Sequence, residues 1–267
     1  MLTQLAKTSS LKNKKKVLTN NTKSAIMNTS RTKENKKMIT RNYKENKIDH
    51  RRNYVLFMDC ESTNGLEDAL AYDLGGKVID TRGNVYEAFS FVNADIYKDE
   101  KELMQSAYYA HKLPQYEQGL RDGSRTMSTT YSMRKYIRQL CEAYGIKFVC
   151  AHNARFDKAS LDTTIRYVTK SKTRYFLPYG LTWWDTRRMA ESVIWKMPTY
   201  RKFCEKHDLF TPTGKLSATA ENLYRFITKN VNFEESHTGL EDVEIETEIM
   251  LYCFRQHKKM RKTLYRN

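Results

Sequence analysis

The sequence predicts an α/β protein whose mixed sheet opens with three antiparallel strands, continues with parallel strands and is flanked by helices. The first observation is the apolar run YVLFMDCE at 54–61, which is rich in strand formers and ends in acidic residues. The second is a turn signal between two half-apolar runs within 75–93. The third is an alternation of strand-like and helical patterns from residue 147 onward, which favours a sheet with helical crossovers.

Each element has its own local signal. The run 54–61 is expected to be the first strand, and Gly83 and Asn84 favour a hairpin turn between the next two. Apolar residues at helical spacing predict the first two helices, and Gly145 stands where the second should end. The elements expected after the hairpin are helices at 99–112 and 130–144, a strand at 147–153, a helix at 156–169, a strand at 181–186, and helices at 186–194, 200–206, 219–228 and 240–257.

The charge distribution separates an arm from the domain. The 267 residues hold 47 Lys and Arg against 31 Asp and Glu, a formal charge of +16, which suits a polyanionic partner or simply aids solubility. Residues 1–52 carry 15 of the basic and 3 of the acidic side chains, with few large apolar residues and no sustained period. We therefore expect a disordered basic arm at 1–52, a folded domain at 53–257 and a basic tail at 258–267.

Cysteine usage and hydropathy indicate a reducing, aqueous compartment. The five cysteines form no CxxC pair and do not resemble a zinc site or a disulfide framework. The chain has no run of about 18 apolar residues and no secretory signal, and its arm is richer in Lys than in Arg, which disfavours a transit peptide. A cytoplasmic location and no membrane partner are expected.

Two carboxylates at the end of the first strand give the first sign of a metal site. Asp59 and Glu61 are two residues apart, so both side chains leave the same face of an extended backbone. Like charges at that spacing repel unless a cation lies between them. Because the same pattern is common at solvated strand ends, the pair needs support from elsewhere in the chain.

That support comes from two distant stretches. Asp157 begins a helix that follows a predicted strand, at the kind of junction where ligands bind in α/β sheets, although a helix start also favours an acid for its dipole. His237 precedes Asp242 by five residues, which is not one helical face, so the histidine should lie on the lead-in turn while the aspartate lies on the helix. Gly239 would permit a tight approach there.

Together these stretches resemble the DnaQ-like family of 3′-to-5′ exonucleases, in its DEDDh branch on the ribonuclease H-like fold, and look most like phage-encoded members. DCE at 59–61 resembles the first motif, HNARFD at 152–157 the second and HTGLED at 237–242 the third. A sister branch has a tyrosine four residues before the last aspartate, where this chain has Thr238, which indicates the histidine branch. The likeness spans about 53–254.

The resemblance implies hydrolysis of a phosphodiester with two divalent ions, Mg²⁺ or Mn²⁺, about 4 Å apart. His237 would accept the proton of the attacking water, a role suited to its near-neutral pKa. No thiolate or imidazole cluster of the zinc type is offered. The implied metal ligands, which are catalytic together with His237, are Asp59, Glu61, Asp157 and Asp242.

One departure from the family concerns the loop that would meet the terminal nucleotide. Family members commonly read D-x-E-T-T-G-L, whereas DCESTNGL has an extra residue, Asn64, before Gly65. The substrate contacts implied by the resemblance are Ser62, Thr63, Leu66, Asn153 and Phe156.

Other polar residues near the motifs are interpreted as structural. His152 is expected to be structural rather than catalytic, and most tyrosines and tryptophans are expected in the core or on the sheet surface. The acidic residues expected to form a solvated face of the last helix are Glu241, Glu244, Glu246 and Glu248.

Three functions are therefore considered. The leading one is a metal-dependent 3′-to-5′ exonuclease acting on single-stranded 3′ ends of DNA, either proofreading for a DNA polymerase as partner or trimming ends, in the bacterial host cytoplasm if phage-encoded. The second is RNA trimming by the same chemistry. The third is a non-catalytic nucleic-acid-binding module in which the basic arm contacts phosphates, which the presence of all five site residues disfavours.

Overall fold

The computed structural model describes residues 48–49, 51–63 and 68–266. The chain divides into two units, Met1–Asp49 and His50–Asn267, and the description below concerns the second. The basic arm predicted for 1–52 lies almost wholly outside the described residues, as do Asn64, Gly65 and Leu66 of the departing loop.

The described residues form one mixed sheet of seven strands in the order β4-β3-β2-β1-β5-β6-β7. The first three strands pair antiparallel, and β5 and β6 continue from β1 in parallel, so the predicted ribonuclease H-like arrangement is confirmed. The strands are β1 (Tyr54–Thr63), β2 (Leu70–Asp80), β3 (Val85–Asn93), β4 (Thr126–Ser128), β5 (Phe148–Ala151), β6 (Thr182–Asp185) and β7 (Thr263–Arg266).

Two edge strands were not predicted from the sequence. The strand β4 pairs parallel to β3, and β7, which lies in the segment assigned to the C-terminal tail, pairs antiparallel to β6. Each spans four residues or fewer and is rich in polar residues, so neither shows a usable hydrophobic period.

Helices flank the sheet, and most lie where the helical period places them. They are α2 (Ala94–Tyr97), α3 (Lys101–Ser106), α4 (Leu113–Asp122), α5 (Thr130–Tyr144), α6 (Arg155–Thr169), α7 (Thr186–Val193), α8 (Pro198–His207), α9 (Ala220–Thr228) and α10 (Gly239–Arg255), with the 3₁₀ turn η1 (Ala110–Lys112) before α4. Thr129 caps α5 by accepting a hydrogen bond from the Ser132 amide, and Gly145 ends it with a left-handed backbone, as expected.

The single helix predicted for 99–112 is wrong. The chain instead forms α3, η1 and then α4, and the break falls at Ala107, whose backbone is extended. Pro114 lies in the first turn of α4, where its missing amide hydrogen costs nothing, so a new helix begins there rather than continuing the old one.

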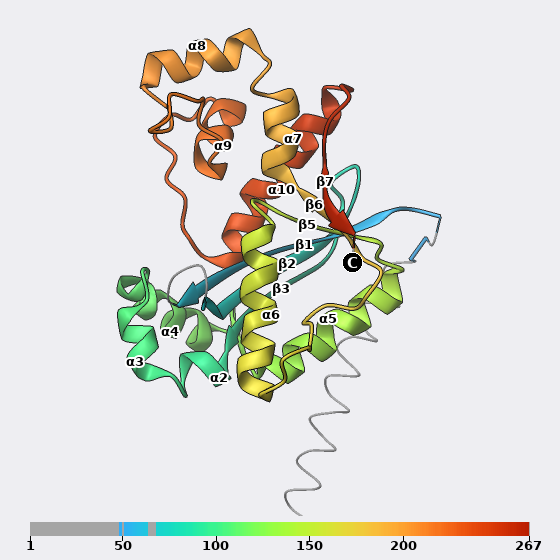
Figure 1. Cartoon of the computed structure of the whole chain (residues 1–267), viewed down its shortest axis with the longest axis vertical. Helices are drawn as coiled ribbons and strands as arrows, with labels where there is room; N and C mark the ends of the chain where they lie inside the picture. The colour runs from blue at the N-terminus through green and yellow to red at the C-terminus, as the bar shows by residue number, and fades with distance from the viewer. Residues whose placement is uncertain (1–47, 50, 64–67, 267) are drawn as a thin grey trace, which may run out of the picture. The chain divides into compact units, whose positions relative to one another are not determined.

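The sheet is buried between helices. Every residue of β2 is buried, and both α6 and α10 pack against β1 and β2. Figure 1 shows α6 crossing in front of these strands. The larger core cluster joins α7, α8, α9 and α10 to β1 and β5, and a smaller one lies under α2, α3 and α4. The ends of β1, α6 and α10 are thereby fixed side by side.

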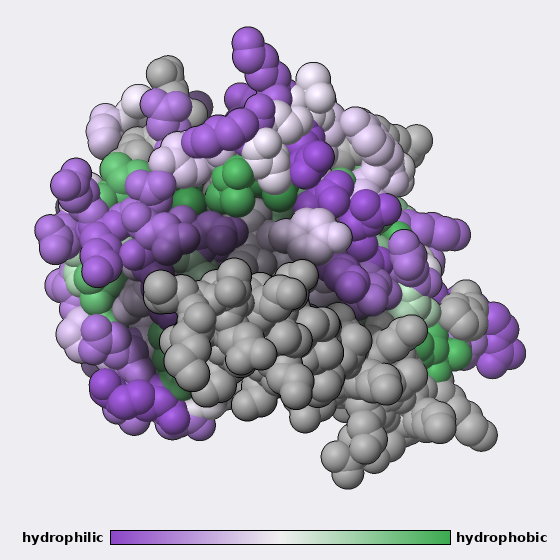
Figure 2. Space-filling model, turned by 90° about the horizontal axis from the view of Figure 1, so that it is seen from below, coloured by the Kyte–Doolittle hydropathy of each residue, from purple (hydrophilic) through white to green (hydrophobic). Residues whose placement is uncertain are grey.

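The described part of the surface in Figure 2 is mainly hydrophilic, with hydrophobic residues in small separate groups. Of the helices formed by the described residues, none combines the length and the apolar character that a bilayer crossing requires.

Candidate active site

The first two site carboxylates lie on β1, where it runs between β2 and β5. Asp59 and Glu61 face the same way because they are two residues apart on a strand, and in register they oppose Gly75 and Asp73 of β2. The Oδ2 atom of Asp59 is shielded from solvent and has no hydrogen-bond partner among the described residues. A buried carboxylate oxygen without a donor is costly unless a cation binds it.

Asp157 joins this pair from the first turn of α6. The amide of Cys60 donates a hydrogen bond of 3.1 Å to its Oδ1, which ties the start of α6 to the middle of β1. Its Oδ2 atom is buried and, within the described part of the chain, has no partner. Two carboxylates from separate elements therefore direct unpaired oxygens into one buried space.

The start of α10 supplies the remaining predicted residues. His237 lies on the lead-in turn with a left-handed backbone (φ 50°), and Asp242 lies on the helix, where its amide donates to the Thr238 carbonyl. Glu61, His237 and Asp242 each offer a ligand atom within 4.8 Å of the others. The predicted placement of the histidine on the turn and the aspartate on the helix is what the structure has.

Mutual repulsion and burial raise the pKa values of the carboxyls. Burial, reinforced by neighbouring acids, raises the pKa of Glu61 to about 8 and that of Asp242 to about 8. Burial likewise raises the pKa of Asp157 to about 7, although the Cys60 amide opposes it. Asp59 is raised well above its ordinary value by burial and then by Asp157. Such a cluster favours protons or cations between its members.

The residues fit a divalent-cation centre. Carboxylate oxygens are hard ligands of the kind that Mg²⁺ and Mn²⁺ prefer, and two of them are buried without donors. Those that would hold the cation are Asp59, Glu61, Asp157 and Asp242.

A fifth carboxylate, Glu246, was missed, and its assignment to a solvated face is wrong. Its side chain is buried, its Oε2 has no partner among the described residues, and its field raises the pKa of Asp59. Burial and then Asp157 and Asp242 raise the pKa of Glu246 well above its ordinary value, and the His152 backbone opposes that rise. Glu246 lies one helical turn after Asp242, on the face that also holds Ile249 and Met250. That i, i+4 spacing was the available signal.

The other acids of α10 behave differently from Glu246. Glu244 is exposed and pairs with the buried Lys77, and Glu248 is exposed and pairs with Arg255. Glu241, whose side chain is 47 % exposed, is held by Arg125 rather than left to solvent. The prediction of a solvated face is therefore wrong for Glu246 and agrees with the exposure of Glu241, Glu244 and Glu248.

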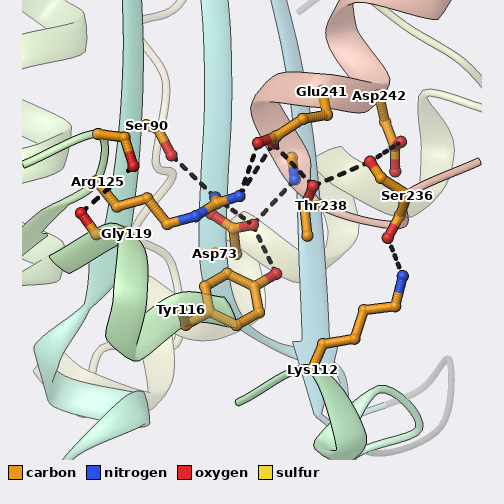
Figure 3. A network of polar contacts seen from close by, with 12 residues as sticks. Asp73, Ser90, Lys112, Tyr116, Gly119, Arg125, Ser236, Thr238, Glu241 and Asp242 are labelled. Atoms are coloured by element: carbon orange, nitrogen blue, oxygen red, sulfur yellow. Dashed lines mark hydrogen bonds and ion pairs between the residues drawn. The ribbon is translucent and has the colours of Figure 1, made fainter. Parts of the chain in front are cut away.

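A buried polar network holds the turn before α10 (Figure 3). The Oδ2 atom of Asp73 on β2 accepts hydrogen bonds from the Tyr116 hydroxyl (2.8 Å) and the Gly239 amide (2.9 Å). The guanidinium of Arg125 lies 3.5 Å from the same oxygen and donates two hydrogen bonds to Glu241, at 2.9 and 3.0 Å. The first turn of α10 is thus fixed to β2 and α4 by charge-assisted bonds.

A second set of contacts reaches His237 itself. The ammonium of Lys112 donates to the Ser236 carbonyl, and the Ser236 hydroxyl donates to Asp242 Oδ1 at 3.3 Å (Figure 3). The Tyr109 ring stacks on the His237 imidazole with centroids 4.7 Å apart and planes 18° from parallel. Burial first, and then Lys112, lower the pKa of His237. The imidazole is therefore neutral near pH 7 and able to accept a proton.

The residues expected to contact substrate are placed as follows. Ser62 is half-buried at an irregularity of β1, whereas Thr63 is buried and its hydroxyl donates to the Leu70 carbonyl. Asn153 is exposed with a left-handed backbone (φ 61°), and Phe156 is half-buried in the first turn of α6. Leu66 lies outside the described residues. Thr63 therefore turns its hydroxyl inward, and Ser62, Asn153 and Phe156 retain some exposure.

The prediction that His152 is structural agrees with its contacts. Its Nδ1 lies 2.8 Å from the Thr186 hydroxyl and its Nε2 lies 2.7 Å from the Ala218 carbonyl, so both ring nitrogens are engaged away from the carboxylates. Burial lowers its pKa to about 4, which keeps the ring neutral. Asp185 likewise caps α7 and accepts from the Asn153 amide.

Fold and site together define a mixed-sheet α/β protein with a buried acidic centre of the divalent-cation type and a neutral histidine at its edge. No family model matches the chain, and no curated protein matches it.

The chain is similar to several solved structures, each at low identity. A full-length 3′-exonuclease is 13% identical with a TM-score of 0.49, over 79% of this chain and 85% of that one. A 3′-exonuclease recognising the histone mRNA stem-loop is 13% identical with a TM-score of 0.45, over 87% and 74%. E. coli Exonuclease I in complex with a 5cy-dT13 oligonucleotide is 13% identical with a TM-score of 0.47, over 77% and 41%. At TM-scores below 0.5 these likenesses do not define this chain's function, which has to rest on its own site.

Proposed function

We propose that the chain is a metal-dependent 3′-to-5′ exonuclease of the DEDDh branch of the DnaQ-like family, acting on DNA. One observation carries the proposal: Glu61 of β1 and Asp242 of α10 lie with the neutral His237 in one cluster, and Asp59 of β1 and Asp157 of α6 are near enough to raise each other's or the neighbouring acids' pKa values, although these residues span 184 positions from Asp59 to Asp242. Two of them have buried oxygens without donors in the described residues. A purely structural cluster would place donors there.

Each residue has a role in the proposed reaction. Asp59, Glu61, Asp157 and Asp242 would hold the divalent cations, and Asp59 lies within the electrostatic influence of the other three acids. Bound cations supply activation of water and stabilisation of the leaving oxygen. His237 accepts the proton of the attacking water, which its lowered pKa allows at neutral pH.

We propose that the chain is a phage-encoded, stand-alone protein that either proofreads for a polymerase or trims ends. An exoribonuclease would use the same five residues, so the test must include both sugars. A non-catalytic module is the remaining alternative, and it predicts binding without turnover.

The deciding experiment is to incubate the full chain with 3′-labelled and 5′-labelled single-stranded DNA and RNA, with Mg²⁺, with Mn²⁺ and with EDTA. Stepwise loss from the 3′ end that EDTA abolishes is expected. Asp59→Ala should remove turnover while keeping the thermal melt, because loss of one buried acid relieves repulsion in the metal-free protein.

A matched control is Glu248→Ala, which removes an exposed acid from α10 and should leave turnover unchanged. Replacement of His237 by Gln should slow hydrolysis by about 10² to 10⁴ and spare metal binding. Full turnover in Asp59→Ala would exclude the proposed metal centre.

A further inference from the structure

A second feature lies beside the acidic centre and has the opposite charge. A pocket of about 500 Å³ opens next to the first half of α6. Its lining includes two cations, Arg155 and Lys158, and three tyrosines, Tyr175, Tyr179 and Tyr265. Cations interleaved with aromatic rings are the combination that binds single-stranded nucleic acid.

The pocket adjoins the proposed metal site through α6. Arg155 is two residues before Asp157, so the two side chains leave the helix about 200° apart. Asp157 points inward to the Cys60 amide, whereas Arg155 is exposed and lines the pocket. Burial and then Asp162 raise the pKa of Tyr265 on β7, and Asp157 is close enough to raise it further. A strand with its 3′ end at the carboxylates therefore has this pocket as a neighbour.

The tyrosines differ in how firmly they are held. The Tyr175 ring lies between two cations, with Lys158 Nζ 5.1 Å and Arg166 Cζ 5.0 Å from its centroid. Tyr179 meets Tyr175 edge-on, with centroids 5.4 Å apart, and is 76 % exposed. Tyr175 is thus a fixed wall, and the faces of Tyr179 are open for stacking.

The two cations of the pocket, Lys158 and Arg155, also differ in whether a carboxylate holds them. Lys158 is engaged by Asp162, with Nζ 2.5 Å from Oδ2, whereas among the described residues no carboxylate pairs with Arg155. More arginines follow the pocket along α5. Arg134 of α5 donates to the Tyr175 carbonyl. Burial lowers the pKa of Arg134, and Arg138 of α5 and Arg174, which precedes Tyr175 in the chain, are near enough to lower it further. Clustered cations of this kind attract phosphates.

We propose that this pocket binds the single strand on the 5′ side of the nucleotide being removed, with a base stacked on Tyr179 and phosphates on Arg155 and on the arginines of α5. The inference rests on the proposed function, because it takes the carboxylates as the place of the 3′ end. The open, cationic lining favours a polyanion over a small apolar ligand. An acidic peptide is the competing occupant, and the crosslink below distinguishes it.

The test measures binding of a 5′-fluorescent dT12 strand to the full chain in EDTA, by anisotropy. Tyr179→Ala should weaken binding by about tenfold, and Tyr179→Phe should restore it, because stacking needs only the ring. Arg155→Gln should weaken binding and reduce the slope of log affinity against log salt by about 0.7, one phosphate contact on a single strand.

Matched controls come from the other end of the domain. Phe210, an aromatic residue 39 % exposed beside the bridge to Leu216, and Arg201, an exposed cation of α8, both lie outside the pocket. Phe210→Ala and Arg201→Gln should bind as the wild type does. Equal affinity of Tyr179→Ala and the wild type would overturn the proposal, as would equal losses in Phe210→Ala.

A crosslink separates this inference from the nuclease proposal. A strand carrying one 5-iodouridine, moved stepwise from the 3′ end, should crosslink on irradiation to the peptide of Tyr175 and Tyr179 at one or two internal positions. If 3′ ends are hydrolysed but no position crosslinks to that peptide, the proposal of strand binding in the pocket is wrong and the nuclease proposal is supported. If the crosslink forms but no strand is hydrolysed, strand binding in the pocket is supported and the nuclease proposal is wrong. Binding of a fluorescent acidic peptide that Tyr179→Ala weakens, together with no binding of dT12, would also overturn the proposal.

Discussion

Gly75 of β2 and Gly239 of α10 lie in direct backbone contact, and this contact places the start of α10 beside the end of β1 that carries Asp59. A Cβ on Gly239 would stand 2.6 Å from the Gly75 nitrogen and 2.9 Å from the Asp59 carbonyl oxygen, and a Cβ on Gly75 would overlap the Leu240 nitrogen. The approach predicted for Gly239 is therefore present, with Gly75 as its partner. Asp242 reaches the β1 carboxylates because neither glycine carries a side chain.

Gly75→Ala should destabilise the fold by about 3 kcal/mol, since the added methyl meets backbone that no rotamer change can move. The measurement is urea unfolding of the full chain. Gly214→Ala is the control, because Gly214 has a left-handed backbone (φ 74°) but open space around its Cβ, so only backbone strain of about 1 kcal/mol is expected. Equal losses in the two variants would contradict the close contact.

The sequence predicted the parts of the site whose signal is local. Asp59, Glu61, Asp157, His237 and Asp242 each stand next to an element with a clear period. By contrast, Arg125 is buried by its pairing with Asp73 and Glu241, which lie 52 and 116 positions away, and no local pattern announces such pairs. The sequence offered no clear sign that Glu246 points inward, because Glu244 and Glu248 on either side of it are exposed. A run of alternating acidic residues therefore looks like a solvated face even when one of its members is buried.

The metal-free protein should lose stability as pH rises from 6.5 to 8.5. Glu61 and Asp242, with pKa values of about 8, and Asp157, with a pKa of about 7, keep protons in the folded state that the unfolded chain has released. Because the folded state binds more protons, unfolding free energy falls with pH, by about 1 kcal/mol or more over this range. Below pH 6.5 the lowered pKa of His152 acts in the opposite direction.

The measurement is chemical unfolding in EDTA at several pH values, repeated with excess Mg²⁺. Asp242→Asn removes one of the raised groups and should flatten the EDTA profile, and Mg²⁺ should flatten that of the wild type by displacing the protons. A wild-type profile in EDTA that does not fall above pH 6.5 would show that the acids are not in mutual contact.

Glu246→Gln should raise the melting temperature of the metal-free protein by about 3 °C. Burial and then the neighbouring acids raise the pKa of Glu246 well above its ordinary value, so folding at neutral pH has to protonate this carboxyl, and a neutral amide avoids that cost. The same variant should bind Mn²⁺ severalfold more weakly in calorimetry, since one acid of the centre is lost. Glu248→Gln, two residues further along α10 but 47 % exposed, should change neither value. A lower melting temperature for Glu246→Gln would contradict the expected cost of burying this acid.

Tyr109 should matter to turnover through its stack on His237. Tyr109→Ala removes the ring that shields and orients the imidazole, and we expect kcat on a short oligonucleotide to fall about tenfold. Because burial is the main cause that lowers the His237 pKa, exposure should raise it, so the acid limb of the pH–kcat profile moves to higher pH. Tyr109→Phe keeps the ring and should restore both kcat and the position of the acid limb.

The control is Tyr131→Ala, which removes an exposed ring on α5 and should alter neither kcat nor the acid limb. An unmoved acid limb in Tyr109→Ala, with kcat reduced, would mean that the ring supports only the local fold, because a general base freed from its covering ring must titrate differently.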